Sequence, residues 1–252
     1  MVLFPRYLIN LKSSTDRLQS MRARLEPLGL FFERIEAVDA KTLSEEDLSV
    51  DQTPSIAYPR KLRSGELACF LSHRECWKRL VASKDDWALV LEDHCVFSSQ
   101  VQEYLASTDW IPVECELIQF VWSKNPVYFD KQIPLENENS LVRLNSSSPI
   151  GTSAYFISKK AAQIALDESQ WIYGPVDNFL FGSLSGFSRQ VRAWRLLGAV
   201  VKRNETTVTT IQGRAQKKVI NAKSVDPRRI YTKLRTKAKR LYLDKAYQYW
   251  ID

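Results

Sequence analysis

Three ionisable side chains, Glu92, Asp93 and His94, directly follow the apolar run of residues 87–91. Such a run is typical of a buried central strand, and open α/β sheets bind ligands beyond the carboxyl ends of such strands. Because side chains alternate along a strand, we expect Glu92 and His94 on one side and Asp93 on the other, unless the chain already turns there. These residue types favour a metal or nucleotide-sugar site. The alternative is that the acids only begin a solvated loop or cap the next helix.

A histidine and a cysteine share one face of the helix that the sequence predicts just before this strand. Over residues 65–80, that face carries Cys69, His73, Cys76 and Leu80. A histidine on such a face is either hydrogen-bonded in the core or part of a binding site, and the local pattern leaves both readings open. The four cysteines have no C-x-x-C spacing, so we expect reduced, packed thiols and no disulfide framework.

The elements that position these residues begin with a strand, a helix and a second strand. Residues 7–10 predict a short strand, the leucine and methionine spacing predicts a helix over 13–28, and residues 30–38 predict the next strand. This unit is expected to be right-handed, with parallel strands. Asn10 and Asp39 then fall at the same edge of the sheet, where a nucleotide can lie.

The second half of the chain adds further strands and helices. We predict a helix over 98–106, strands over 117–122, 151–157 and 197–201, a helix from 158 to 166, and a small antiparallel excursion over 125–145. Asp177 is most simply the N-cap of a helix over 178–184. The order of elements indicates an α/β fold with a Rossmann-type, mostly parallel sheet flanked by helices.

Charge is concentrated near the C-terminus. The chain of 252 residues has a formal net charge of +7, and nine basic against three acidic residues from Lys223 onward account for +6 of it. The nearly neutral remainder argues against a broad nucleic-acid groove. We predict that this basic tail is helical, with apolar residues on one side and cations on the other. Such a helix suits either an anionic membrane or packing on its own domain. No apolar run is long enough to span a membrane, and no signal peptide is recognised.

Four ordered blocks within residues 5–181 carry a family resemblance. They are YLINL at 7–11 with DR at 16–17; FERIEAVDA at 32–40; GELACFLSH at 65–73 followed by WALVLED at 87–93; and GTxxYxIS at 151–158 with PVD at 175–177. Together they resemble glycosyltransferase family 25, which contains bacterial lipooligosaccharide galactosyl- and glucosyltransferases and collagen-modifying relatives. The tail beyond about residue 200 matches poorly.

The resemblance implies a GT-A-like domain over residues 1–205, followed by a basic tail over 206–252. It also implies a UDP-galactose or UDP-glucose donor, Mn²⁺ or a similar cation, and inversion of the anomeric centre. Asp93 and His94 would hold the metal, with His94 standing where the family usually has a third carboxylate. Imidazole suits Mn²⁺, Zn²⁺ or Co²⁺ better than Mg²⁺. Either the site prefers a softer metal, or Asp93 becomes the ligand, or metal dependence is weaker.

The same resemblance assigns roles to the other candidate residues. The donor-binding set is Asn10, Arg17, Asp39, Glu66, Ser72, His73 and Glu92. Inversion by single displacement needs a carboxylate base on the acceptor side, and Asp177 is the candidate. The expected acceptor is a lipid-linked lipooligosaccharide or LPS core, with galactose first and glucose second as the transferred hexose. The expected location is the cytoplasm, peripheral on the inner face of a bacterial inner membrane.

Two alternatives remain open at this point. One is a non-catalytic adaptor that binds a membrane surface or a polyanion through the basic tail. The other is an enzyme of the same fold that uses a UDP-N-acetylhexosamine donor.

Overall fold

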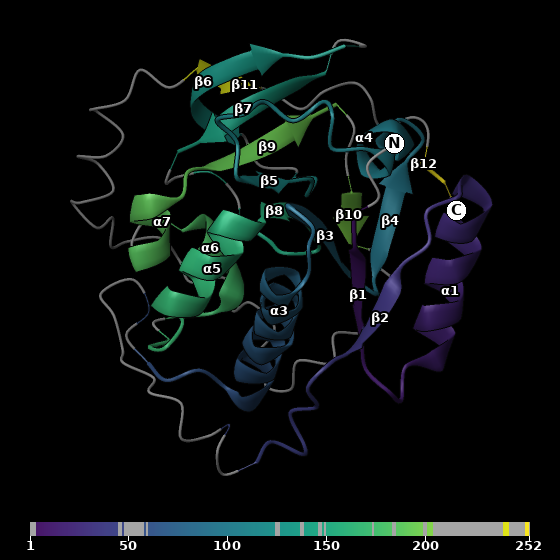
Figure 1. Cartoon of the computed structure of the whole chain (residues 1–252), viewed down its shortest axis with the longest axis vertical. Helices are drawn as coiled ribbons and strands as arrows, with labels where there is room; N and C mark the ends of the chain where they lie inside the picture. The colour runs from purple at the N-terminus through teal and green to yellow at the C-terminus, as the bar shows by residue number, and fades with distance from the viewer. Residues whose placement is uncertain are drawn as a thin grey trace, which may run out of the picture.

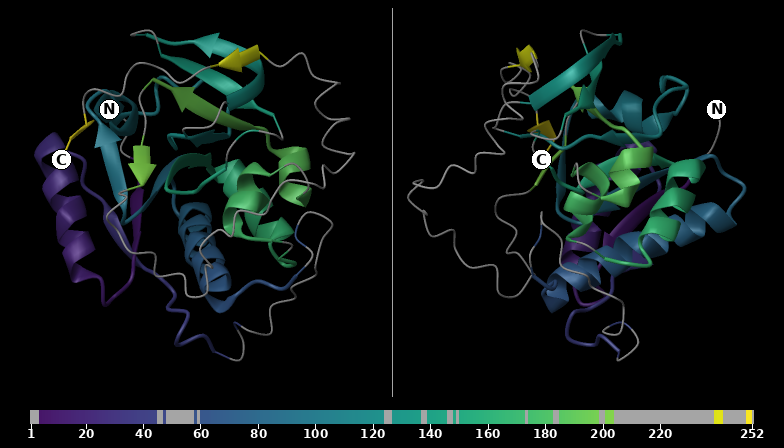
Figure 2. Two further views of the ribbon diagram at one scale, coloured as in Figure 1. Left: turned by 180° about the vertical axis from the view of Figure 1, so that it is seen from behind. Right: turned by 90° about the vertical axis from the view of Figure 1, so that its left-hand side faces the viewer.

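The computed structural model describes residues 4–44, 47, 58, 60–123, 127–136, 139–145, 148, 150–172, 174–182, 185–198, 201–203, 239–241 and 250–251. These residues form a three-layer α/β structure, in which helices cover both faces of one large sheet (Figures 1 and 2). Its strand order is β11-β6-β7-β9-β5-β8-β3-β1-β2. A three-stranded sheet, in the order β10-β4-β12, lies beside it.

The first half of the chain builds the predicted βαβ unit. It comprises β1 (Arg6–Asn10), α1 (Thr15–Leu25), a 3₁₀ turn (Glu26–Leu28), β2 (Glu33–Glu36), α3 (Ser64–Ala82) and β3 (Trp87–Glu92). Strand β1 pairs in parallel with both β2 and β3, which confirms the prediction. Gly29 ends the 3₁₀ turn in the left-handed region, with φ of 70°, a conformation that glycine adopts without steric cost.

The second half adds the remaining strands and four short helices. Their bounds are β4 (Cys95–Ser98), α4 (Val101–Ala106), β5 (Leu117–Gln119), β6 (Val127–Pro134), β7 (Ser140–Leu144), β8 (Ala154–Ser158), α5 (Lys159–Glu168), α6 (Val176–Phe181), α7 (Gly186–Gln190), β9 (Ala193–Leu197), β10 (Val201–Arg203), β11 (Lys239–Leu241) and β12 (Trp250–Ile251). The predicted antiparallel excursion is confirmed as the β6–β7 pair. The predicted strand over 197–201 is wrong, because the chain turns at Gly198, with φ of 99°, between β9 and β10.

The prediction of a mostly parallel sheet is wrong. Among the strand pairs of this sheet that the structure describes, only β1–β2, β1–β3 and β5–β9 are parallel, and β8 runs antiparallel to both of its neighbours, β3 and β5. The physical reason is that the chain enters β8 next to the carboxyl end of β3, where Glu92 N donates to Ser153 O at 2.9 Å. The antiparallel direction of β8 therefore brings the residues just before it to the candidate site.

Alternation along the central strands divides the core between the two faces of the sheet. Tyr7, Ile9, Val90 and Tyr155 pack with α3, α5, α6 and α7 on one face. On the other face, Leu8, Leu89, Leu91 and Phe156 pack with α1 and α4. Both faces of β3 are covered, and its residues Ala88 to Leu91 are at most 1% exposed. A continuous apolar run is what such a doubly buried strand requires.

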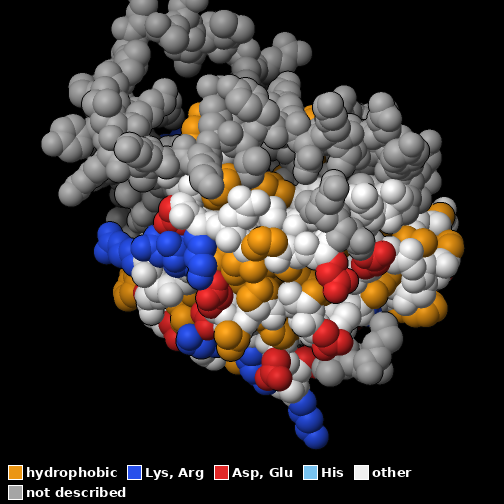
Figure 3. Space-filling view, turned by 90° about the horizontal axis from the view of Figure 1, so that it is seen from above, with side chains coloured by type: hydrophobic (Ala, Val, Ile, Leu, Met, Phe, Trp, Pro, Cys, Tyr) orange, Lys and Arg blue, Asp and Glu red, His pale blue; other side chains and the backbone are white. Residues whose placement is uncertain are grey.

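Most of the predicted basic tail lies outside the described residues. Its five described residues form β11, which pairs with β6, and β12, which pairs with β4, so the helix prediction is wrong for these five. On the face shown in Figure 3, basic, acidic and hydrophobic side chains are interspersed among the described residues. No helix within the described residues is long and apolar enough to cross a membrane.

Candidate active site

Glu92, the last residue of β3, is surrounded by hydrogen-bond donors and imidazoles. Its Oε1 accepts from Thr152 Oγ1 at 2.7 Å and lies 3.4 Å from His73 Nε2, while its Oε2 lies 3.5 Å from His94 Nδ1. Burial by itself would raise the pKa of this carboxyl, but His73, His94 and Thr152 lower the pKa to about 2. Glu92 is therefore a carboxylate placed between both histidines of the chain.

Asp93 points to the opposite face of the sheet. Its Oδ2 accepts from Asn10 Nδ2 at 2.7 Å, and its Oδ1 pairs with Arg17 Nη1 at 3.0 Å. Arg17 also donates to Ser14 Oγ at 2.5 Å, and Asn10 Nδ2 donates to Ser14 O at 2.9 Å. Burial raises the pKa of Asp93 above its ordinary value, and the contacts with Asn10 and Arg17 only partly oppose this shift. The predicted division of the triplet between two sides is confirmed, and Asp93 joins β3 to the start of α1.

Thr152 and Ser153 belong to the site although neither was predicted from the sequence to be a site residue. Thr152 bonds Glu92, and Ser153 Oγ lies 3.0 Å from His94 Nε2. Ser153 O also accepts from Cys95 Sγ at 2.9 Å. Both residues reach the site because β8 starts at the end of β3. The sequence shows only that small polar residues precede a strand. The antiparallel pairing of β8 with β3 is what places them at the site.

His73 is completely buried on α3, and a buried polar network orients its ring. His73 Nδ1 lies 2.9 Å from Tyr155 Oη, which also accepts from Trp77 Nε1 at 3.0 Å. Burial raises the pKa of Tyr155 well above its ordinary value, so the phenol is neutral. Among the described residues, His73 Nε2 has no hydrogen-bond partner and faces Glu92. His73 is thus a core residue on one side and a site residue on the other.

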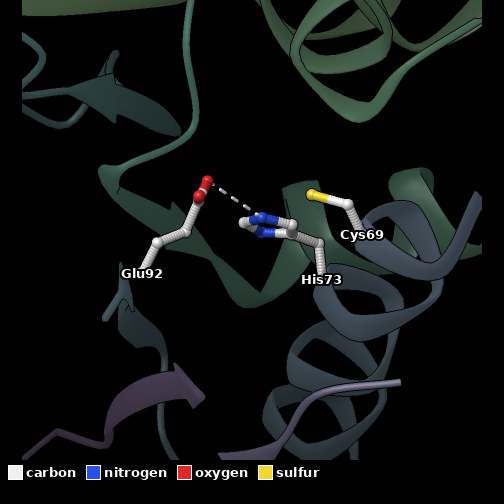
Figure 4. A group of neighbouring side chains, drawn as sticks. All are labelled: Cys69, His73 and Glu92. Atoms are coloured by element: carbon white, nitrogen blue, oxygen red, sulfur yellow. Dashed lines mark ion pairs between the residues drawn. The ribbon is translucent and has the colours of Figure 1, made fainter. Parts of the chain in front are cut away.

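Cys69 lies one turn before His73 on the same face of α3 and completes a cluster with Glu92. The Cys69 Sγ, a His73 ring nitrogen and a Glu92 carboxylate oxygen all lie within 4.8 Å of one another. Figure 4 shows the three side chains directed toward a common point from α3 and β3. None of the four cysteines forms a disulfide in the structure; three are buried, whereas Cys69 is only partly buried and is not a purely packed thiol.

The other predicted donor-site residues are held by bonds within the protein. Buried Ser72 Oγ donates to Ala68 O at 2.7 Å and accepts from Val38 N at 2.9 Å, which ties α3 to the loop after β2. In that loop, Asp39 accepts from Lys41 N at 2.9 Å. Ala37 N donates to Asn10 O at 3.0 Å, so this loop starts beside the end of β1, as predicted.

Glu66 stabilises the start of α3. It accepts from Arg60 Nη2 and Tyr58 Oη, both at 2.8 Å, and from Arg63 N at 2.9 Å. Burial would raise the pKa of Glu66, but these hydrogen bonds outweigh it and lower the pKa. In this arrangement Glu66 fixes the first turn of the helix that carries Cys69 and His73.

Asp177 lies in the first turn of α6 and is not its N-cap, because the helix begins at Val176 after the N-cap Pro175. Its Oδ1 accepts from Asn178 N at 2.9 Å. Helix α6 packs against α3 through Phe179, whose ring lies 5.1 Å from Phe70 and 5.7 Å from Trp77 between ring centroids. Asp177 therefore belongs to the helical layer that also carries His73.

The predicted metal ligands, Asp93 and His94, do not fit one shared cation. Both Asp93 oxygens are engaged by Asn10 and Arg17, and a carboxylate paired with a guanidinium is a poor cation ligand. His94 instead lies beside Glu92 and Ser153. The carboxylate next to His94 is thus Glu92 and not Asp93.

Comparison with known proteins identifies relatives of this site. The family model described as "Glycosyltransferase family 25 (LPS biosynthesis protein)" matches residues 4–180, a segment that contains every candidate residue named above.

Among the relatives, human procollagen galactosyltransferase 2 is 30% identical over 187 residues, which are 69% of this chain and 29% of that protein. The lacto-N-neotetraose biosynthesis glycosyltransferase LgtE of Neisseria meningitidis is 24% identical over 181 residues, which are 66% of this chain and 62% of that protein. The chain thus spans less than two thirds of either relative.

A solved structure is also similar, that of a glycosyltransferase involved in the glycosylation of the major capsid of PBCV-1. Its TM-score is 0.34, with 13% identity, over 65% of this chain and 64% of that one. A likeness at this level does not identify a shared fold.

Proposed function

The chain belongs to glycosyltransferase family 25, and from this membership we propose that it transfers a hexose from a UDP-sugar to a hydroxyl of a lipooligosaccharide or LPS core. Galactose is the first candidate, because the human relative is a procollagen galactosyltransferase, and glucose is the second. The LPS acceptor is supported by the description of the family as an LPS biosynthesis protein. The observation that carries the proposal is the polar cluster at the carboxyl ends of the parallel strands β1 and β3, where open α/β sheets bind ligands.

The proposed reaction is a single displacement that inverts the anomeric centre. An acceptor hydroxyl oxygen attacks the anomeric carbon and forms the new C–O bond, while the bond to the diphosphate breaks and UDP leaves with the electron pair. The acceptor proton passes to a carboxylate, and Asp177 in α6 is the candidate base. Arg17, whose side chain is 17% exposed beside Asn10, is the candidate for attracting the anionic donor.

Several donor-site residues have a positioning role in this proposal. Asp93 fixes Asn10 and Arg17 at the end of β1, and Ser72 fixes the loop that contains Asp39. Glu66 fixes the start of α3. Because these residues are bonded within the protein, their replacement should affect donor binding through misplaced neighbours. We also propose that the chain works at the cytoplasmic surface of the inner membrane, where a lipid-linked acceptor would be presented.

A screen of UDP-sugars for UDP release, with truncated lipooligosaccharide as acceptor, tests this function. We expect turnover with UDP-galactose or, second, UDP-glucose, and an inverted linkage in the product. Highest turnover with a UDP-N-acetylhexosamine would overturn the choice of donor. Absence of turnover with every donor, together with vesicle or polyanion binding that survives Asp177→Asn, would identify the adaptor function instead.

A further inference from the structure

We infer that Cys69, His73 and Glu92 form a binding site for one thiophilic divalent cation, of which Zn²⁺ and Co²⁺ are the natural occupants. The site is separate from the Asp93–His94 pair that the sequence predicted. It requires neither donor nor acceptor to be occupied, so its existence does not depend on the proposed transfer reaction.

The ligand set and its spacing carry the inference. A thiolate, an imidazole and a carboxylate are the three ligand types that Zn²⁺ takes in proteins, and the thiolate selects against Mg²⁺ and Ca²⁺. Ligand atoms around a tetrahedral Zn²⁺ stand about 3.3–3.7 Å apart, as the usual bond lengths require. His73 Nε2 and Glu92 Oε1 already lie 3.4 Å apart. Cys69 Sγ lies within 4.8 Å of a His73 ring nitrogen and of a Glu92 carboxylate oxygen.

A second, independent observation is the unsatisfied nitrogen of His73. The residue is 0% exposed, and its Nε2 makes no hydrogen bond of good geometry within the described part of the chain, although it lies 3.4 Å from Glu92 Oε1. A buried polar atom without a partner is costly, and coordination of a cation removes that cost. Figure 4 shows the His73 ring and the Cys69 sulfur directed toward Glu92, so the nitrogen faces the other two ligands.

The surroundings of His73 match those of a metal-binding histidine. Such a histidine usually uses its other ring nitrogen to bond an oxygen that fixes the ring orientation. His73 Nδ1 lies 2.9 Å from Tyr155 Oη, and Trp77 holds that oxygen from the other side at 3.0 Å. Thr152 does the same for the carboxylate, through its 2.7 Å bond to Glu92 Oε1.

Two of the three ligand residues are partly exposed to solvent. Cys69 is partly exposed, and the side chain of Glu92 is 19% exposed, although His73 is fully enclosed. Three protein ligands leave one coordination position open, which is the arrangement of catalytic zinc sites rather than of closed structural ones. A water molecule or an anionic oxygen can occupy that position.

Metal titration of tag-free, chelator-treated protein without any sugar nucleotide tests the site. Titration with Co²⁺ should produce the visible bands of tetrahedral Co²⁺ and a thiolate-to-cobalt charge-transfer band, and calorimetry with Zn²⁺ should give one site per chain. Cys69→Ala should abolish the charge-transfer band. Cys69→Ala and His73→Asn should each weaken Zn²⁺ binding by more than about 100-fold, since even loss of an outer-shell partner costs 10- to 100-fold.

Cys76→Ala is the matched control, because Cys76 lies on the same helix, its Sγ donates to Ser72 O at 3.6 Å, and it is not part of the Cys69–His73–Glu92 group. This variant should keep the charge-transfer band and the Zn²⁺ affinity, and circular dichroism verifies that all variants are folded. Absence of a thiolate band in the wild-type protein, or Zn²⁺ binding that folded Cys69→Ala retains in full, would overturn the inference. Neither result would bear on hexose transfer, which the UDP-release assay measures separately.

Discussion

The carboxylates of Glu92 and Asp93, adjacent in the sequence, are held on opposite faces of the central strand. Glu92 faces α3, where His73 lies 3.4 Å away, while Asp93 faces α1 and pairs with Arg17 at 3.0 Å. The two acids therefore have different partners and, in our proposals, different tasks. Glu92 is available to a ligand or cation, whereas Asp93 holds the end of β1 in place.

Asp93→Asn should lower the free energy of unfolding by about 1–3 kcal/mol, because it leaves the largely buried Arg17 without its charged partner. Urea unfolding monitored by circular dichroism measures the loss. The matched control is Asp130→Asn, which breaks the exposed Asp130–Arg143 pair and should change stability by no more than about 0.5 kcal/mol. An unchanged stability in Asp93→Asn would remove Asp93 from this positioning role.

His94→Asp should make the protein's thermal stability respond to Mn²⁺. The new carboxylate would face Glu92, whose Oε2 is 3.5 Å from His94 Nδ1, and two like charges destabilise each other unless a cation lies between them. We expect a lower melting temperature in chelator and a larger rise with Mn²⁺ than in the wild-type protein. Equal Mn²⁺ shifts in both proteins would show that position 94 does not contact a cation.

Asp177→Asn should abolish hexose transfer while UDP binding survives, because an amide cannot accept the acceptor proton. UDP release and calorimetric UDP binding are measured on the same preparation. Asp167→Asn is the control, since Asp167 is an acid near the end of α5 that accepts from Gln163 in an exposed hydrogen bond. Loss of UDP binding in Asp177→Asn would make Asp177 a donor-site or structural residue.

Because of Glu92, the free energy of unfolding should decrease as the pH falls from about 4.5 to about 2. Its pKa is about 2 in the folded chain against an ordinary value of 4.5. A lowered pKa contributes stability above pH 4.5, and the contribution disappears as the pH falls toward 2. This difference in pKa corresponds to a contribution of at most about 3 kcal/mol to the free energy of unfolding.

Urea unfolding of the wild-type protein and Glu92→Gln at pH 5 and pH 3, both in chelator, isolates this contribution. The difference in stability between the two proteins should shrink at the lower pH, because the glutamine amide of the variant does not titrate. A difference that is the same at both pH values would contradict the lowered pKa of Glu92.

The sequence by itself determined those features that depend on local periodicity. The apolar run of residues 87–91 predicted a doubly buried strand, and the spacing of residues 65–80 placed Cys69 and His73 on one helix face. Alternation along a strand predicted that Glu92 and Asp93 would separate. The four blocks indicated the family that the match over residues 4–180 then established.

Only the tertiary structure decided which side chains meet. The direction of β8 depends on where the chain re-enters the sheet after the β6–β7 excursion, and no local pattern encodes this. That direction brings Thr152 to Glu92, and the packing of α3 on β3 brings Cys69 and His73 to the same carboxylate. Propensity and periodicity act over a few residues, whereas contacts across 19 to 60 positions of sequence are set by the packing of whole elements.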